Sequence, residues 1–89
     1  MNFGMALERL KRGVRVARAG WNGKGMWIVL VTAGTDYPPQ HAYVVTEPNG
    51  ALLPRALLPW IGMKTADDCF VPWLASQTDL LAEDWEIVT

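Results

Sequence analysis

The sequence contains a single cysteine and a single histidine, and it has no long apolar run. Cys69 alone cannot form an intramolecular disulfide, and His41 alone cannot supply a metal cage, so neither structural zinc nor a Cys–His catalytic pair is supported. We expect Cys69 to be a small buried side chain and His41 to lie in a loop. The longest uninterrupted apolar run, residues 26–31, is much shorter than the about 20 residues that a membrane span needs. The first residues show no signal-peptide pattern, so we expect a cytoplasmic protein.

Charged residues are also scarce, at 19% of the chain, whereas hydrophobic residues reach 51%. This balance excludes intrinsic disorder and predicts one globular domain over residues 1–89. A chain of this length buries only roughly 60 to 65% of its unfolded surface, so apolar surface is left over and association between subunits is expected. The formal net charge of -1 does not favour DNA or RNA as partners. Five tryptophans, a residue common in interfaces and ligand pockets, indicate a binding protein.

The few charges are unevenly distributed along the chain. Residues 1–24 carry six basic side chains and one acid, while residues 65–89 carry six acids and neither lysine nor arginine. One interpretation is that the two ends pair within the fold or across a subunit interface. The other is a local basic pocket for phosphate near Arg18 and Lys24. Different arginines can serve each purpose, so both interpretations stand.

The N-terminal third predicts a helix followed by a strand hairpin. Apolar residues recur at helical spacing over residues 3–12, between an N-cap at Asn2 and a stop at Gly13. Alternation over residues 14–19 predicts a strand with one solvated face. The β-branched apolar run 26–32 predicts a central strand that pairs with it.

The rest of the chain predicts mostly short strands. Seven glycine, proline and asparagine residues between 33 and 55 leave room there for one short strand, at 41–46. Two strands joined by a turn, a short helix and a final strand are predicted at 57–64, 69–73, 76–82 and 85–88. Pro59 and Pro72 place the first two of these near edges or bulges of the sheet. Together these elements predict an α+β fold with an antiparallel sheet, an N-terminal helix and a short C-terminal helix.

The glycine-rich turn at residues 20–25 is the first candidate for ligand binding. Its backbone amides lie next to glycines, which lets N–H groups approach an anion. Its glycine spacing matches neither the dinucleotide-binding fingerprint nor the phosphate loop of NTPases, and an ordinary hairpin turn explains it equally well. Trp21 offers a stacking face worth about 1 to 3 kcal/mol per base, and Asn22 can pair with a purine edge. These two side chains favour a nucleotide-like ligand.

The second candidate is the stretch that follows Trp73. Residues 76–79 resemble a capping box with Asp in place of Glu and begin a helix, where anions can bind. From the residues alone, capping by Ser76 and Asp79 and packing by Trp73 form the simpler interpretation.

A third stretch, Glu83 and Asp84 with Glu86, has the composition of a carboxylate pair for acid–base or magnesium chemistry. Adjacent carboxylates at a helix end point in different directions, and no histidine or lysine accompanies them. We therefore expect a solvated face or a basic partner instead of a catalytic pair.

Four stretches of the sequence together resemble a family of small phage proteins. They are residues 3–7, 17–26, 58–66 and 71–85. The long strings Trp-Asn-Gly-Lys-Gly and Trp-Leu-x-Ser-Gln-Thr-Asp make the resemblance specific, and residues 33–55 match nothing in it. The family includes the second type of Thoeris anti-defence protein.

The resemblance implies an anti-defence function in the infected bacterial cell. Members of the family bind cyclic ADP-ribose isomers made by bacterial immune TIR enzymes, and some relatives also hold cyclic oligonucleotides. They act as sponges that do not cleave the ligand, and they form homotetramers with pockets between subunits. The resemblance thus implies no catalytic residue, no cofactor and no metal.

The resemblance also implies which residues bind the ligand, by motif position. The implied stacking residues are Trp21 and Trp73. The implied hydrogen-bonding residues for base and ribose are Asn22, Ser76, Gln77, Thr78 and Asp79. The implied pyrophosphate-binding residues are Arg18, Lys24 and Lys64. Residues 33–55 are left as a place in the chain that can determine which ligand is bound.

Two other classes of function stay open from the residues alone. A nucleotide-processing enzyme would need a base, for which His41 or Asp84 is available. A protein-binding module would use the tryptophans as interface hot spots. Recovery of intact ligand from the denatured protein excludes the enzyme, and a melting temperature that no messenger raises favours the module.

Overall fold

The computed structural model describes residues 1–21, 24–32 and 58–89. Asn22, His41 and the strand expected at 41–46 lie outside the described residues. The chain divides into two compact units, one made of Met1–Leu30 with Ile61–Thr89 and the other of Val31–Trp60. Of the second unit, the structure describes residues 31–32 and 58–60, which include the last residue of strand β2 (Trp27–Val31) and the first residue of strand β3 (Trp60–Lys64).

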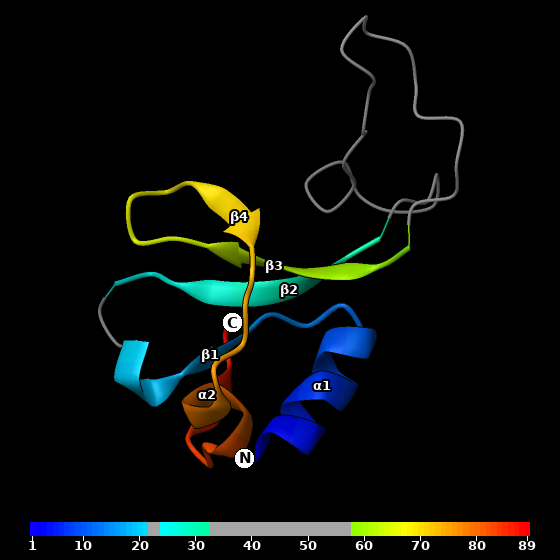
Figure 1. Cartoon of the computed structure of the whole chain (residues 1–89), viewed down its shortest axis with the longest axis vertical. Helices are drawn as coiled ribbons and strands as arrows, with labels where there is room; N and C mark the ends of the chain where they lie inside the picture. The colour runs from blue at the N-terminus through cyan, green and yellow to red at the C-terminus, as the bar shows by residue number, and fades with distance from the viewer. Residues whose placement is uncertain (22–23, 33–57) are drawn as a thin grey trace, which may run out of the picture. The chain divides into compact units, whose positions relative to one another are not determined.

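Five short strands form one sheet in the order β4-β3-β2-β1-β5 (Figure 1). They are β1 Val16–Arg18, β2 Trp27–Val31, β3 Trp60–Lys64, β4 Phe70–Pro72 and β5 Trp85–Ile87. The described residues also form helices α1 Phe3–Lys11 and α2 Gln77–Leu81, and a 3₁₀ turn Ala19–Trp21. The predicted α+β class is confirmed, with its antiparallel sheet and both helices. The β-branched run of β2 holds the middle of the sheet, as predicted.

Helix α1 begins and ends where its sequence signals stand. The Asn2 side chain accepts a hydrogen bond of 2.9 Å from the backbone N–H of Met5, which satisfies a donor that the first turn leaves unpaired. Gly13 follows the helix with a φ of +82°, a left-handed conformation that favours glycine. Ala6 and Leu10 form the buried face of α1 and pack into the hydrophobic core.

Both predicted hairpins are present. Strand β1 pairs antiparallel with β2, with Val16 opposite Ile28. Strand β3 pairs antiparallel with β4, with Met63 opposite Val71. Pro72 lies on β4, at the edge of the sheet, where its missing N–H costs no ladder hydrogen bond.

The turn between β3 and β4 corrects one expectation. The backbone N–H of Thr65 donates to the carbonyl of Cys69 at 2.8 Å, and Asp68 takes a φ of +66° to close the turn. Cys69 is exposed, so the expectation that it is buried was wrong. The residue directly follows a tight turn at the sheet edge, where little chain is available to cover it.

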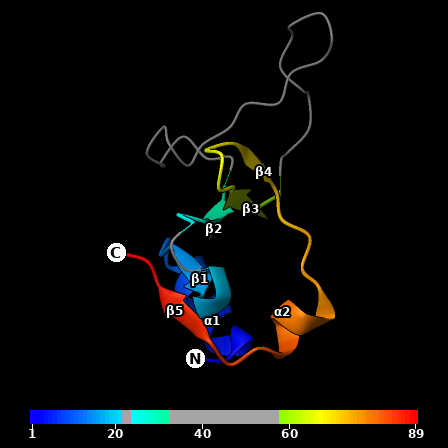
Figure 2. The same cartoon turned by 90° about the vertical axis from the view of Figure 1, so that its left-hand side faces the viewer.

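Strand β5 lies beside β1, a pairing that the local sequence pattern did not predict. Arg18 stands opposite Trp85 in this antiparallel register. The backbone N–H of Trp85 donates to the carbonyl of Met1 at 3.1 Å, and the Met1 ammonium donates to the Trp85 carbonyl at 2.8 Å. Figure 2 shows β5, in red, running next to β1. The pairing brings the acidic end of the chain to its basic end.

Trp85 stands at the centre of the core. Its side chain is only 2% exposed, and it packs in one cluster with Ala6, Leu10, Val16 and Ile28. Truncation of a buried tryptophan to alanine typically costs about 3 to 5 kcal/mol, a large share of a small domain's stability. The core of the first unit therefore depends strongly on this one side chain.

Candidate binding site

Three aromatic rings contact Trp85 and form with it the aromatic cluster, which consists of Phe3, Trp21, Trp73 and Trp85. Trp21 and Trp73 meet Trp85 edge to face, with ring centroids 5.4 and 5.9 Å away and interplanar angles of 83° and 88°. Phe3 lies 5.4 Å from Trp85 and 5.8 Å from Trp73. Edge-to-face pairs are favoured by about 0.5 to 1.5 kcal/mol beyond area burial. The contact with Trp85 gives each of these two rings a defined orientation. Both Trp21 and Trp73 are only partly buried, so part of each side chain stays accessible.

The structure thus brings together the two tryptophans that the sequence analysis selected, one before β2 and one after β4. The residue that joins them, Trp85, was not among the binding residues expected from the sequence. Trp85 stands first in the last predicted strand, and the apolar–polar step from Trp85 to Glu86 was the available signal of its burial. That signal is weak, because the alternation does not continue: Ile87 is 44% exposed.

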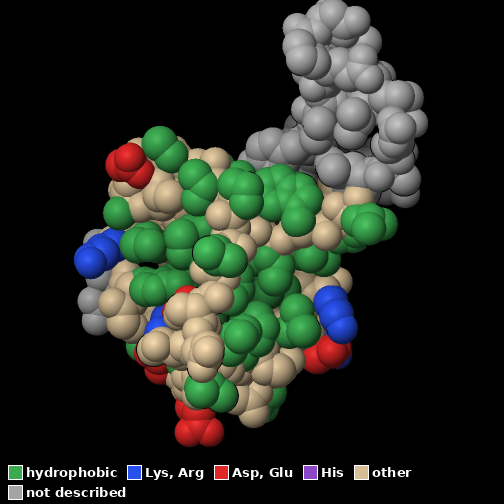
Figure 3. Space-filling view, in the orientation of Figure 1, with side chains coloured by type: hydrophobic (Ala, Val, Ile, Leu, Met, Phe, Trp, Pro, Cys, Tyr) green, Lys and Arg blue, Asp and Glu red, His purple; other side chains and the backbone are tan. Residues whose placement is uncertain are grey.

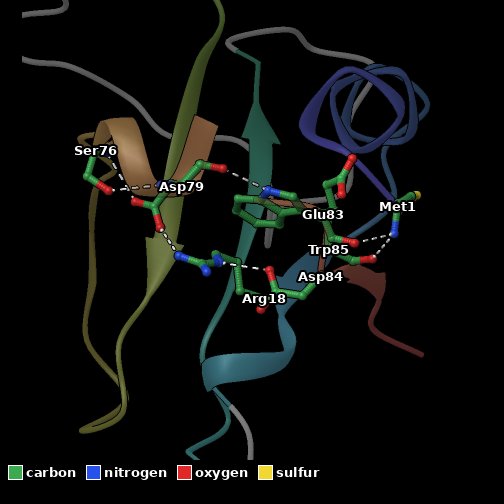
Figure 4. A network of polar contacts seen from close by, with 7 residues as sticks. All are labelled: Met1, Arg18, Ser76, Asp79, Glu83, Asp84 and Trp85. Carbon is green, nitrogen blue, oxygen red and sulfur yellow. Dashed lines mark hydrogen bonds and ion pairs between the residues drawn. The ribbon is translucent and has the colours of Figure 1, made fainter. Parts of the chain in front are cut away.

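Arg18 connects β1 with two carboxylates from the C-terminal third, and we call Arg18, Asp79 and Asp84 the arginine junction (Figure 4). Its Nε donates to Asp84 Oδ1 and its Nη1 to Asp79 Oδ1, each at 3.0 Å. The Arg18 and Asp79 side chains are 20% and 15% exposed, and that of Asp84 is 38% exposed. Asp84 therefore has a basic partner, one of the two outcomes expected for it, and the two ends of the chain pair within the fold, one of the two arrangements expected for them.

The carboxylates of the arginine junction are stabilised in their ionised form. The hydrogen bond from Arg18 is the main cause that lowers the pKa of Asp84 from its ordinary value of 3.8. Burial acts most strongly on Asp79 and raises its pKa, but hydrogen bonds from the Ser76 backbone and from Arg18 outweigh burial, and the pKa is lowered. The hydrogen bonds to Asp84 and Asp79 raise the pKa of Arg18. At neutral pH the junction holds one cation and two anions, a net charge of -1.

Asp79 also caps the first turn of helix α2, through the predicted capping box with Ser76. Its backbone N–H donates to Ser76 Oγ at 3.0 Å, and its Oδ2 accepts from the Ser76 backbone N–H at 3.1 Å. The carbonyl of Asp79 accepts a 3.0 Å hydrogen bond from the indole Nε1 of Trp85. Gln77 and Thr78, between the two capping residues, are exposed. The polar turn of α2 is therefore attached directly to the aromatic cluster.

Two lysines lie at the glycine-rich turn. The ammonium of Lys64 donates to the Gly25 carbonyl at 3.0 Å and to the Thr65 carbonyl at 3.4 Å, and lies 3.5 Å from the Asp68 carboxylate. Gly25 has a φ of +66°, and a Cβ there would stand 3.5 Å from the Lys64 ammonium. Lys24, the preceding residue, is exposed. The contact between Lys64 and Gly25 places a second cation beside Lys24 at this turn.

The predicted ligand-binding residues that the structure describes therefore fall into two groups. Those around the aromatic cluster and the arginine junction are Arg18, Trp21, Trp73, Ser76, Gln77, Thr78 and Asp79. Those at the glycine-rich turn are Lys24 and Lys64. Within residues 1–21, 24–32 and 58–89, no three His, Cys, Asp or Glu side chains are grouped so that they could hold a metal ion. No helix in that same part of the chain has the length and apolar character needed to cross a membrane.

Comparison with known proteins agrees with the resemblance in the sequence and extends it over residues 33–55, which the matched range also covers. Residues 1–88 match the Thoeris anti-defense 2-like domain. The chain is similar to the protein named Thoeris anti-defense 2 of Bacillus phage SP01, with 41% identity over 92 residues that cover 100% of this chain and 96% of that protein. The chain therefore belongs to the Thoeris anti-defense 2-like family, whose role is phage anti-defence.

Proposed function

We propose that the chain acts as a sponge for bacterial immune messengers, and that it binds cyclic ADP-ribose isomers, and cyclic oligonucleotides as a further class, without cleaving them. The observation that carries this proposal is the pair of partly exposed indoles, Trp21 and Trp73, oriented by one buried indole beside a polar turn. Partly exposed tryptophans suit stacking on adenine, which contributes about 1 to 3 kcal/mol per base. The whole chain acts in this proposal as one messenger-binding domain in the cytoplasm of the infected cell.

The described polar residues have chemistry that suits the rest of such a ligand. Gln77 and Thr78 are exposed on the first turn of α2 and can exchange hydrogen bonds with base edges and ribose hydroxyls. The Ser76 hydroxyl accepts a bond within the capping box and keeps its own O–H to donate. Lys24 and Lys64 supply the positive charge for the pyrophosphate. Asn22 belongs to the same proposal by its motif position.

Sequestration without turnover fits the electrostatics better than catalysis by Asp84 does. A carboxylate that works as a general base needs a pKa raised toward neutrality. The pKa of Asp84 is lowered by its hydrogen bond from Arg18, which makes this carboxylate a weak base. Tight binding of the ground state, with no group to favour a transition state, is what a sponge requires.

Exposed apolar side chains support a homotetramer, which is the second part of the proposal. Leu74 and Leu81, before and on α2, are 91% and 79% exposed, and Met5 on α1 is 55% exposed. Figure 3 shows hydrophobic side chains, in green, spread over the face that carries both helices. Apolar surface of this kind marks interaction sites, and a stable interface buries more than about 1,000 Å². We propose that this face lies between subunits of the tetramer.

One experiment tests the sponge directly. The purified protein is incubated with a panel of cyclic nucleotides and ADP-ribose isomers, freed of unbound ligand and heated, and the released molecule is identified by chromatography and mass spectrometry. A sponge releases one messenger unchanged, at fixed stoichiometry, with or without magnesium or a chelator. Ligand consumption that continues beyond stoichiometry would identify an enzyme. If the protein retains no messenger and no messenger raises its melting temperature, the result favours a protein-binding module.

A further inference from the structure

Among the described cations at the candidate site, Arg18 is the least available for contact with a ligand phosphate. Both of its bonded nitrogens face carboxylates at 3.0 Å, and its side chain is 20% exposed. A pyrophosphate that approached it would meet two carboxylates around one guanidinium, a group with net charge of -1, and like charges repel. The lysines at the glycine-rich turn do not carry this surplus of negative charge, because Lys64 faces one carboxylate and Lys24 is exposed.

Asp79 connects Arg18 to the rest of the site through both its carboxylate and its backbone carbonyl. Its Oδ1 accepts from Arg18 and its Oδ2 accepts from the Ser76 backbone, so both oxygens are engaged within the chain. Its carbonyl holds the indole N–H of Trp85. Figure 4 shows Arg18 lying between Asp79 and Asp84, with the Trp85 indole directed at the Asp79 carbonyl. Loss of the guanidinium therefore loosens the capped turn of α2 and the indole at the centre of the aromatic cluster together.

We propose that Arg18 is a positioning residue for the messenger site and does not contact the phosphates. It acts through Asp79, and Asp84 holds the guanidinium in place from the other side. The side chains it positions are Gln77 and Thr78 on α2, and Trp21 and Trp73 through Trp85. This role rests on the proposed function, because the site it orders is the one assigned there to the messenger.

The substitution Asp84→Asn separates the two possible roles by the sign of its effect. The amide is similar in size to the carboxylate, and it brings the junction from net -1 to zero charge. If Arg18 bound the pyrophosphate, removal of a competing carboxylate would strengthen messenger binding. If Arg18 is a positioning residue, loss of a charge-assisted hydrogen bond loosens it, and we expect affinity for a cyclic ADP-ribose isomer to fall about three- to tenfold.

The substitution Arg18→Lys gives an independent second measurement. Lysine keeps the positive charge but lacks the planar fork that reaches Asp79 and Asp84 together. Because Nε and Nη1 already face carboxylates, a phosphate would meet Arg18 at a single point, a contact that a lysine ammonium also makes. Such a contact would keep the affinity within about threefold, whereas a positioning role predicts a loss of about tenfold or more. Val29→Ala is the matched control, because Val29 is buried on β2 and is not a member of the Trp85 core cluster. It destabilises the fold without touching the junction, and its affinity should stay within about twofold of the unchanged chain.

Calorimetric titration with the isomer that the unchanged chain retains, below the melting temperature of each variant, measures these affinities. Exchange of the Trp85 indole N–H with solvent, followed by NMR in the ligand-free chain, gives a second readout. Val29→Ala shows how far global destabilisation alone accelerates this exchange, and Arg18→Lys and Asp84→Asn should accelerate it more than their loss of melting temperature accounts for on that scale. Tighter or unchanged binding by Asp84→Asn, or retained binding by Arg18→Lys, overturns the positioning role and leaves the sponge intact. An unchanged chain that binds no isomer refutes the sponge itself, and the indole exchange rates then still show whether Arg18 holds the cluster.

Discussion

Replacement of Trp85 by phenylalanine tests whether one indole holds the candidate site together. The change removes the 3.0 Å hydrogen bond from Nε1 to the Asp79 carbonyl. That carbonyl keeps the Ala82 N–H as a donor at 3.4 Å, so the lost bond costs about 1 kcal/mol and not the larger penalty of an unpaired buried group. The smaller ring also leaves a void at a site that is 2% exposed, which adds about 1 to 2 kcal/mol.

A total of about 2 to 3 kcal/mol corresponds to a fall of about 10 to 20 °C in melting temperature for a domain of this size. Thermal unfolding followed by circular dichroism measures this shift. Trp27→Phe is the control, because Trp27 is only partly buried and lies against Phe70 at 6.4 Å and Arg15 at 5.0 Å, contacts that a phenylalanine largely keeps. We expect that control to lose less than about 5 °C. A Trp85→Phe chain that melts within about 3 °C of the unchanged protein would refute the central role of this indole.

Three further outcomes are expected. Trp21→Ala or Trp73→Ala should weaken messenger binding by about 1 to 3 kcal/mol, or about five- to 150-fold by calorimetry, and unchanged affinity in a folded variant removes that residue from the site. Light scattering at micromolar concentration should report a tetramer that Leu81→Glu, at a position 79% exposed, dissociates; a monomer of the unchanged chain contradicts the assembly. The pKa of Asp84 in the folded chain lies below its ordinary 3.8, so its ion pair contributes stability above that pH and loses it as the pH falls through the lowered value. The melting temperature should drop on acidification below about pH 4, less steeply in Asp84→Asn, and equal slopes would argue against the pair.

The elements that the sequence predicted correctly depend on contacts between residues close in the chain. The cap of α1 joins Asn2 to the N–H of Met5, and the box of α2 joins Ser76 to Asp79, each across three positions. A positive φ at Gly13 follows from the residue itself, since glycine has no Cβ. The β-branched run of β2 signals a strand buried between neighbours. Such signals need no knowledge of the rest of the chain.

The partners of Arg18 and the role of Trp85 were decided only by tertiary structure. The acidic C-terminal third offers six carboxylates, and no local pattern shows which of them meet Arg18; the capping box marks Asp79 as a helix cap and not as an ion-pair partner. Selection of these two follows from the register of β5 on β1, which sets Arg18 opposite Trp85 and beside the carboxylate that precedes it. That register brings together residues more than sixty positions apart in the chain. A contact between residues so far apart leaves no periodic pattern in the local sequence. The sequence marked Trp21 and Trp73 as candidate ligand contacts. For the same reason, only the folded chain revealed that both rings pack against a third indole, that of Trp85.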